Sequence, residues 1–262
     1  MSGDVPIVFV GPRGGYRGLD RTLVTSLLAR GRTLIEVDTR LQVARAGAGL
    51  RALVGDIADA VEGASVRTGG AATRPALVGY SIGAQAAAAY AAEYPGAVSS
   101  VALVAGWMRA HEKMREVGEL WRLLAPAGAE PGSGSLEAPV RAAQLVLASA
   151  REWPGAIEQD RVNSAASEID GLLALLHDAD LEGVAERIAD PVLVLGCSLD
   201  EFATVQQSRL LFGAIPEARL AEIDCGHLAC VERPAEVVAH IESFIGAPSR
   251  HPAGARIDRF RP

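Results

Sequence analysis

Short apolar runs alternate with helical patterns over the first hundred residues of the chain. Runs of four to eight apolar residues are typical of buried parallel strands. They lie at 5–10, 33–38, 76–80 and 98–105, and the alternation returns with runs at 191–196 and 219–223. Between them, apolar residues recur every three to four positions, as in helices that pack one face against a sheet. The pattern therefore predicts an α/β domain.

The alternation stops between residues 107 and 189, where only helical patterns remain. The helical stretches expected here are 110–124, 140–152 and 169–177. Residues 126–135 are rich in Gly, Pro, Ala and Ser, so we expect them to form a mobile link. The sequence thus predicts an all-helical insertion, after which the α/β domain resumes.

The acidic charge of the chain narrows its possible partners. It has 262 residues, the size of one large domain, and a formal net charge of −7, which argues against nucleic acids and anionic membranes. No apolar run approaches the roughly 20 residues of a membrane span, and no signal peptide is evident. Three cysteines without metal-ligand spacing favour a reducing, cytoplasmic environment. We therefore expect a small-molecule substrate bound in a pocket, and the sequence leaves the oligomeric state open.

One motif joins the third apolar run to an alanine-rich helical stretch. It is Gly79-Tyr80-Ser81-Ile82-Gly83, a G-x-S-x-G turn between a strand and a helix. So sharp a turn strains the serine backbone, exposes its hydroxyl and requires glycine on both sides. The helix that follows directs its partial positive charge at any oxyanion formed there. Short matches of this kind also arise by chance, but the strand and helix around the motif favour a nucleophile over a plain turn.

Two polar residues follow the last two predicted strands. Asp200 comes after the run at 191–196, and His227 comes after the run at 219–223. A serine nucleophile needs a base and the base needs an orienting carboxylate, so both residues are expected beside Ser81. The alternatives are that Asp200 only caps a helix, that Glu201 takes its place, or that His227 is an ordinary loop residue. Surface positions are expected for His111, His177, His240 and His251.

These motifs resemble those of the α/β-hydrolase fold superfamily. The order Ser81, Asp200, His227 is the family's order, and the likeness also includes Glu232-Arg233-Pro234 after the histidine. The resemblance implies a three-layer α/β-hydrolase fold with about six parallel strands. It also implies that Ser81 is the nucleophile, Asp200 the orienting acid and His227 the general base.

The resemblance further divides the chain into parts. Residues 1–106 and 190–246 would form the hydrolase core, 107–189 a helical lid over the pocket, and 247–262 a loosely packed tail. Trp107, Met108 and Trp121 would then line a mainly hydrophobic substrate pocket under the lid.

Two features depart from the family pattern. The family often carries His-Gly after the first parallel strand, where this chain has Gly11-Pro12-Arg13-Gly14. The oxyanion hole would take its backbone N–H groups from Ile82 and, because Pro12 has none, from Arg13. In addition, only a few residues precede the first strand, so the family's opening antiparallel hairpin is not expected. We therefore predict a six-stranded, all-parallel sheet.

The function predicted from these residues is that of a serine hydrolase without cofactor or metal. It would cleave an ester, thioester or lactone of a small to medium, mainly apolar substrate. One alternative is a non-hydrolytic relative that performs elimination, acyl transfer, C–C cleavage or cyclisation in natural-product biosynthesis. The other is a catalytically silent binding protein of the same fold.

Overall fold

The computed structural model describes most of the α/β domain and part of the insertion. The described residues are 5–11, 21–39, 49–67, 74–124, 142, 145–149 and 166–258.

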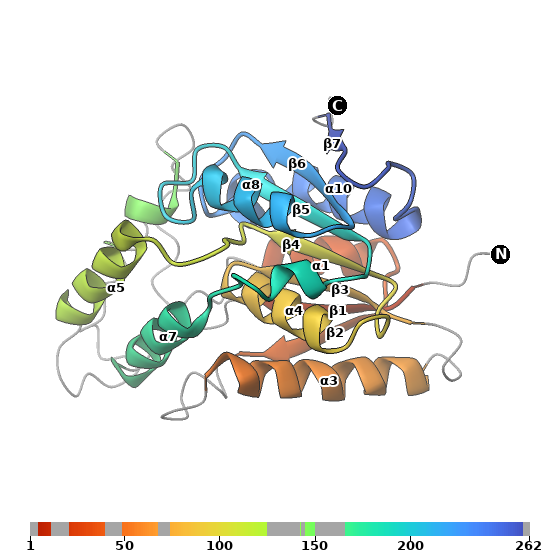
Figure 1. Ribbon diagram of the computed structural model, residues 1–262, viewed down its shortest axis with the longest axis horizontal. Helices are drawn as coiled ribbons and strands as arrows, with labels where there is room; N and C mark the ends of the chain where they lie inside the picture. Colours follow the sequence, from red (N-terminus) through yellow and green to blue (C-terminus); the bar gives the residue numbers. More distant parts are fainter. Residues whose placement is uncertain are drawn as a thin grey trace.

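A single sheet of seven strands forms the centre of the molecule (Figure 1). The strands are β1 (Ile7–Gly11), β2 (Leu34–Asp38), β3 (Ala76–Tyr80), β4 (Ser100–Val104), β5 (Val192–Cys197), β6 (Ala218–Ile223) and β7 (Arg256–Ile257). Their order is β2-β1-β3-β4-β5-β6-β7, and every neighbouring pair is parallel. All their carboxyl ends therefore lie at the same edge of the sheet.

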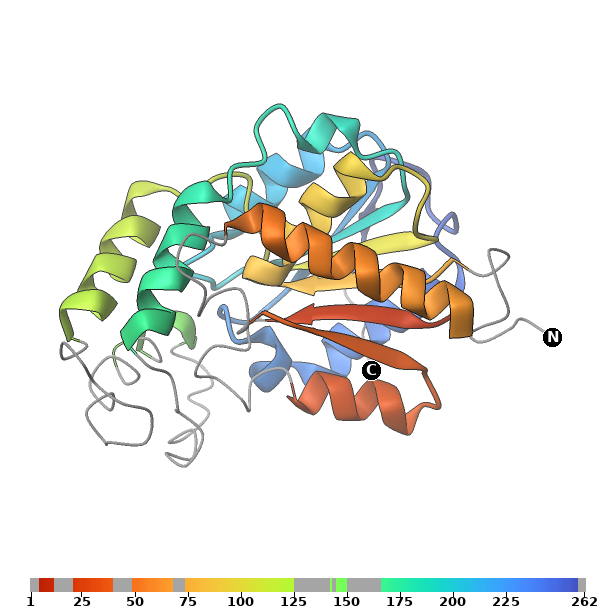
Figure 2. The ribbon, with the colours of Figure 1, turned by 90° about the horizontal axis from the view of Figure 1, so that it is seen from below.

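Helices cover both faces of the sheet, which gives three layers (Figure 2). One face carries α3 (Leu50–Arg67), α4 (Ile82–Glu93) and α8 (Val205–Ala214), and the other carries α1 (Arg21–Ala29), the short α9 (Ala229–Glu232) and α10 (Pro234–Gly246). Alternate residues of each strand enter two separate apolar clusters: Val8 and Leu77 pack toward the first face, and Phe9 and Val78 toward the second. Strands buried on both sides explain the continuous apolar runs of the sequence.

The described part of the insertion is helical. It contains α5 (Glu112–Leu124), α7 (Ala166–Asp178) and a short helical stretch at 145–147, followed by the 3-10 helix η2 (Ala185–Arg187). The helices α5 and α7 pack together at Gly118, where a Cβ atom would overlap the Leu173 side chain. Both lie beyond the carboxyl ends of the strands (Figure 1).

A buried glutamine joins the two ends of the insertion. The Gln85 side chain on α4 donates hydrogen bonds to the carbonyls of Trp107 (2.8 Å) and Ala179 (3.3 Å), and accepts one from the Trp107 N–H (3.0 Å). Beside it, the Leu181 N–H donates to the Met108 carbonyl at 2.9 Å. The insertion is therefore anchored where it leaves and re-enters the sheet.

The predicted α/β-hydrolase fold is confirmed, with two details that the sequence did not give. The tail adds a seventh strand, because Arg256 and Ile257 pair with Leu220 and Ala221 of β6. The described part of the tail, up to residue 258, is also held by Arg219, which is only 4% exposed and donates to the His251 carbonyl at 2.9 Å. The expected link at 126–135 lies outside the described residues. Among the described helices, none is both long enough and apolar enough to cross a membrane.

Candidate active site

Ser81 occupies the strained turn that the sequence predicts. It stands between the end of β3 and the start of α4, with φ = 56° and ψ = −121°, a backbone conformation that side chains rarely adopt. A Cβ atom at Gly79 would overlap the Gly83 carbonyl, and one at Gly83 would overlap the Val10 carbonyl on β1. Both glycines are therefore required for the chain to turn so tightly against the neighbouring strand.

Ser81, His227 and Asp200 form one chain of hydrogen bonds. Ser81 Oγ lies 2.7 Å from His227 Nε2, and His227 Nδ1 lies 2.7 Å from Asp200 Oδ2. The three residues follow β3, β6 and β5, so the parallel sheet brings them together from positions 146 and 27 residues apart. Each is at most 8% exposed, which keeps these bonds away from competing water.

The Asp200 carboxylate also holds its own loop. Its Oδ1 atom accepts hydrogen bonds from the N–H groups of Phe202 (2.8 Å) and Ala203 (2.9 Å). Asp200 does not cap the helix that follows, since α8 begins at Val205 with Thr204 as its N-cap; its second oxygen instead fixes the loop before that helix. Glu201, the rival candidate, is exposed and forms an ion pair with Lys113 at 2.6 Å.

A cluster of three aromatic rings packs against the imidazole of His227. The Phe202 ring meets the imidazole edge-on at a centroid distance of 5.2 Å, and Trp121 stacks on Phe202 at 5.5 Å. Trp107 contacts the same phenyl ring at 6.5 Å. Trp107 and Trp121, two of the three residues predicted to line a pocket, are buried and pack against the phenyl ring that contacts His227. The third, Met108, is half-buried at the base of the insertion.

Of the two expected oxyanion donors, Ile82 lies among the described residues. Ile82 is the first residue of α4, so its N–H has no acceptor within the helix and lies beside Ser81 at the positive end of the helix dipole. Arg13 lies outside the described residues.

The cysteines are buried near this site without forming disulfides. Cys197, Cys225 and Cys230 are all inaccessible to solvent. A hydrogen bond with Cys225 and burial raise the pKa of the Cys197 thiol well above its usual range. A raised pKa makes a thiol a poor nucleophile, so the Cys197 thiol is suited to packing.

Three residues of the site were not singled out by the sequence analysis. Tyr80 donates a 2.6 Å hydrogen bond to the His227 carbonyl, Phe202 covers the imidazole, and Glu232 binds the peptide that precedes His227. Tyr80 and Glu232 both stand within motifs named above, but their partners come from distant parts of the chain. The only signal in the sequence was their closeness to Ser81 and His227.

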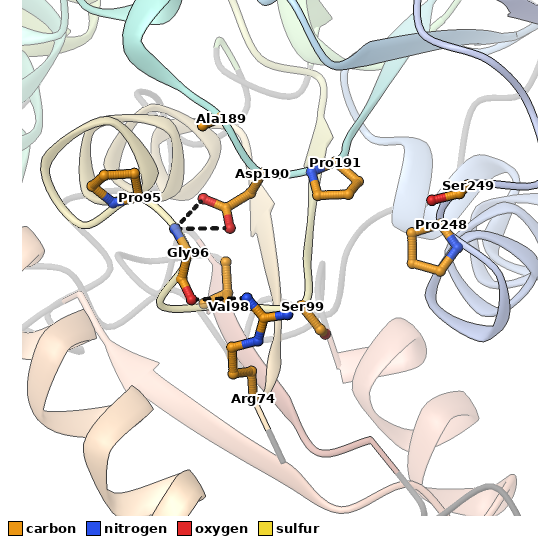
Figure 3. A pocket seen from close by; sticks show the side chains of 10 residues that line it. All are labelled: Arg74, Pro95, Gly96, Val98, Ser99, Ala189, Asp190, Pro191, Pro248 and Ser249. Carbon is orange, nitrogen blue, oxygen red and sulfur yellow. Dashed lines mark hydrogen bonds between the residues drawn. The ribbon is translucent and has the colours of Figure 1, made fainter. Parts of the chain in front are cut away.

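A separate cavity of about 530 Å³ lies at the opposite edge of the sheet. Its walls come from the segments just before β3, β4 and β5, together with Pro248 and Ser249 (Figure 3). There the Asp190 carboxylate accepts the Gly96 N–H at 3.1 and 3.2 Å, and Arg74 donates to the Gly96 carbonyl at 3.0 Å. These bonds hold the turn that follows α4, so the polar groups of this cavity serve the fold.

The sequence of this chain is similar to a known protein family and to several known proteins. Residues 54–234 match the family model of the alpha/beta hydrolase fold. The chain is 28% identical over 175 residues to the pyrrolizixenacetamide deacetylase of Xenorhabdus hominickii, and the aligned region covers 64% of each chain. It is 31% identical over 196 residues to RutD of Klebsiella pneumoniae, whose proposed activity is carbamate hydrolysis. The aligned region covers 71% of this chain and 68% of RutD. The chain thus spans about two thirds of the length of these relatives.

Solved structures share the fold over a longer part of the chain. The enol-lactonase of Burkholderia xenovorans superposes with a TM-score of 0.73 and 21% identity, over 93% of this chain and 92% of the lactonase. At this identity the likeness concerns the fold alone.

Proposed function

This chain belongs to the alpha/beta hydrolase superfamily, and we propose that it is a serine hydrolase that acts on esters, thioesters or lactones. The observation that carries the proposal is the chain of two 2.7 Å contacts from Ser81 through His227 to Asp200. Serine, imidazole and carboxylate in this order are the parts that acyl transfer through a serine needs. Neither a metal nor a cofactor is required by this chemistry.

The proposed reaction proceeds in two acyl-transfer steps. His227 Nε2 takes the hydroxyl proton as Ser81 Oγ attacks the acyl carbon, and Asp200 stabilises the imidazolium through Nδ1. The developing oxyanion is bound by the Ile82 N–H at the positive end of α4, with Arg13 as the proposed second donor. The imidazolium then protonates the leaving group. His227 then deprotonates a water molecule that attacks the acyl carbon, and the imidazolium returns this proton to Ser81 Oγ as the acid leaves.

The surroundings of His227 support a mainly apolar substrate. Phe202, Trp121 and Trp107 present buried aromatic rings on the side of the imidazole that faces the insertion. Apolar walls of this kind favour a small or medium acyl group over a charged or polymeric one. We propose that the insertion acts as the lid of this pocket. The deacetylase and carbamate hydrolase activities named for the two relatives both concern an acyl carbon bound to a heteroatom, which supports hydrolysis by acyl transfer.

Steady-state hydrolysis of nitrophenyl esters tests the proposal. We expect turnover of acetate to hexanoate esters by the wild-type protein, and a loss of at least about 10³-fold in kcat for Ser81→Ala. Ser65→Ala is the matched control, because Ser65 lies on α3 and its hydroxyl donates to the Val61 carbonyl of the same helix. Equal turnover by Ser81→Ala and the wild type would exclude Ser81 as the nucleophile.

A further inference from the structure

The Glu232 side chain lies between the His227 loop and the insertion. It is the last residue of α9 and is only 8% exposed. Glu232 Oε2 accepts the Gly226 N–H at 3.1 Å and also the Ser149 hydroxyl, and Oε1 accepts the Ser149 N–H at 3.1 Å. Burying a carboxylate is unfavourable unless several donors bind it, and here three donors from two distant segments do so.

The insertion also touches the His227 loop directly. A Cβ atom at Gly226 would lie 2.5 Å from the Ser149 nitrogen and 2.8 Å from the Leu147 carbonyl oxygen. These distances are too short for any side chain, so glycine is needed for residues 147–149 to pass over the peptide before His227. Glu232 holds the two segments together at this crossing.

The same short segment takes part in the apolar core on the α4 side of the sheet. Leu147 is buried and belongs to the apolar cluster that contains Trp107, Trp121 and Phe202. Phe202 in turn contacts the His227 ring. A shift of residues 147–149 would therefore disturb the core that contains these rings and, through Glu232, the loop that carries His227.

We infer that Glu232 is a positioning residue that couples the insertion to the His227 loop. Through the Gly226 N–H it fixes the residue before His227, and through Ser149 it fixes the insertion segment whose Leu147 shares the apolar core with the aromatic rings near His227. The inference rests on the proposed function for its kinetic consequences, whereas the coupling itself is a property of the fold. Glu232 acts through other residues and makes no contact with the reacting atoms.

Two variants test separately the bonds of Glu232 to Gly226 and to Ser149. Glu232→Gln replaces one acceptor oxygen with a donor, which opposes the Gly226 and Ser149 donors, so we expect kcat for butyrate ester hydrolysis to fall at least about tenfold. Ser149→Ala removes only the hydroxyl arm and keeps the bond to Gly226. It should therefore raise KM several-fold for hexanoate relative to acetate esters, with a smaller fall in kcat than in Glu232→Gln.

Glu242→Gln is the matched control. It also removes a carboxylate, less buried than Glu232, that pairs with Arg32 between α10 and the turn before β2. All assays are run well below the melting temperature of the least stable variant. If Glu232→Gln and Ser149→Ala lose no more activity than Glu242→Gln, the inference is overturned. Should Glu232→Gln fail to fold, the KM pattern of Ser149→Ala decides.

Hydrogen exchange tests the coupling independently of activity. In Ser149→Ala we expect faster exchange at the Gly226 amide, 77 residues away in sequence, and no such change in Glu242→Gln. Unchanged exchange at Gly226 would overturn the coupling. A wild-type protein that hydrolyses no ester, but shows faster Gly226 exchange in Ser149→Ala, would instead contradict the proposed function and leave the coupling supported.

Discussion

The hydroxyl of Tyr80 donates a 2.6 Å hydrogen bond to the backbone carbonyl of His227. Tyr80 is the residue immediately before Ser81, so the strand that leads into Ser81 also holds the loop that carries His227. The tyrosine is fully buried, and burial raises its pKa well above its usual range, so it remains a neutral donor. Its ring also stacks near the imidazole, at a centroid distance of 6.1 Å.

Removing this hydroxyl should misplace His227. In Tyr80→Phe the buried His227 carbonyl loses its donor, which costs about 1–3 kcal/mol of stability, and we expect kcat to fall about tenfold. Unfolding by urea measures the first effect and nitrophenyl ester hydrolysis the second. An unchanged kcat in a measurably destabilised variant would show that the bond serves only the fold.

The tight turn at Ser81 should tolerate no added atom. In Gly83→Ala the new Cβ atom would overlap the carbonyl of Val10, a backbone atom of β1 that cannot move aside. We expect a loss of at least about 3 kcal/mol in the free energy of unfolding, or no folded protein. Gly55→Ala is the control, because nothing lies within 4 Å of its Cβ position on α3, and it should stabilise the protein by up to about 1 kcal/mol.

One histidine should make the protein sensitive to acid. His240 on α10 is 2% exposed, which corrects the surface position expected from the sequence, and burial lowers its pKa to about 4. Because the unfolded chain has the ordinary pKa near 6.5, it binds this proton more readily than the folded chain between pH 6.5 and 4. Stability is therefore full above pH 6.5 and falls with decreasing pH, by up to about 3 kcal/mol at pH 4.

Substitution of this histidine isolates its share of the acid response. His240→Leu should flatten the dependence of the urea midpoint on pH between 6.5 and 4, whatever its effect at pH 7. The control His177→Gln, at an exposed position on α7, should leave that dependence unchanged. A wild-type slope in His240→Leu would assign the acid response to other groups.

The parts of the site that were predictable are those set by local sequence and strand direction. Gly79 and Gly83 reveal the turn at Ser81 because only glycine fits there. Asp200 and His227 were placed correctly because parallel strands end at one edge of a sheet. Both inferences need only the order of elements along the chain.

The parts that were missed depend on contacts between distant segments. Gln85 binds both ends of the insertion and Glu232 binds Ser149, and no local pattern marks these partners. His240 lies on the apolar side of α10 with Val237 and Ile241, a position that its polar ring conceals in the sequence. The strand β7 was also missed, because its two residues are too few to show strand alternation. Tertiary packing decides these features, and a single sequence carries no direct record of it.

Labelling with a fluorophosphonate tests the central claim most directly. Such a probe reacts with a serine only when a nearby base activates its hydroxyl, so the wild-type protein should gain one phosphonyl group, and peptide mass spectrometry should locate it on Ser81. Ser81→Ala should gain none, while Ser65→Ala should react like the wild type. A folded wild-type protein that is not labelled, or that is labelled at another residue, would contradict the assignment of Ser81, His227 and Asp200 as a catalytic triad.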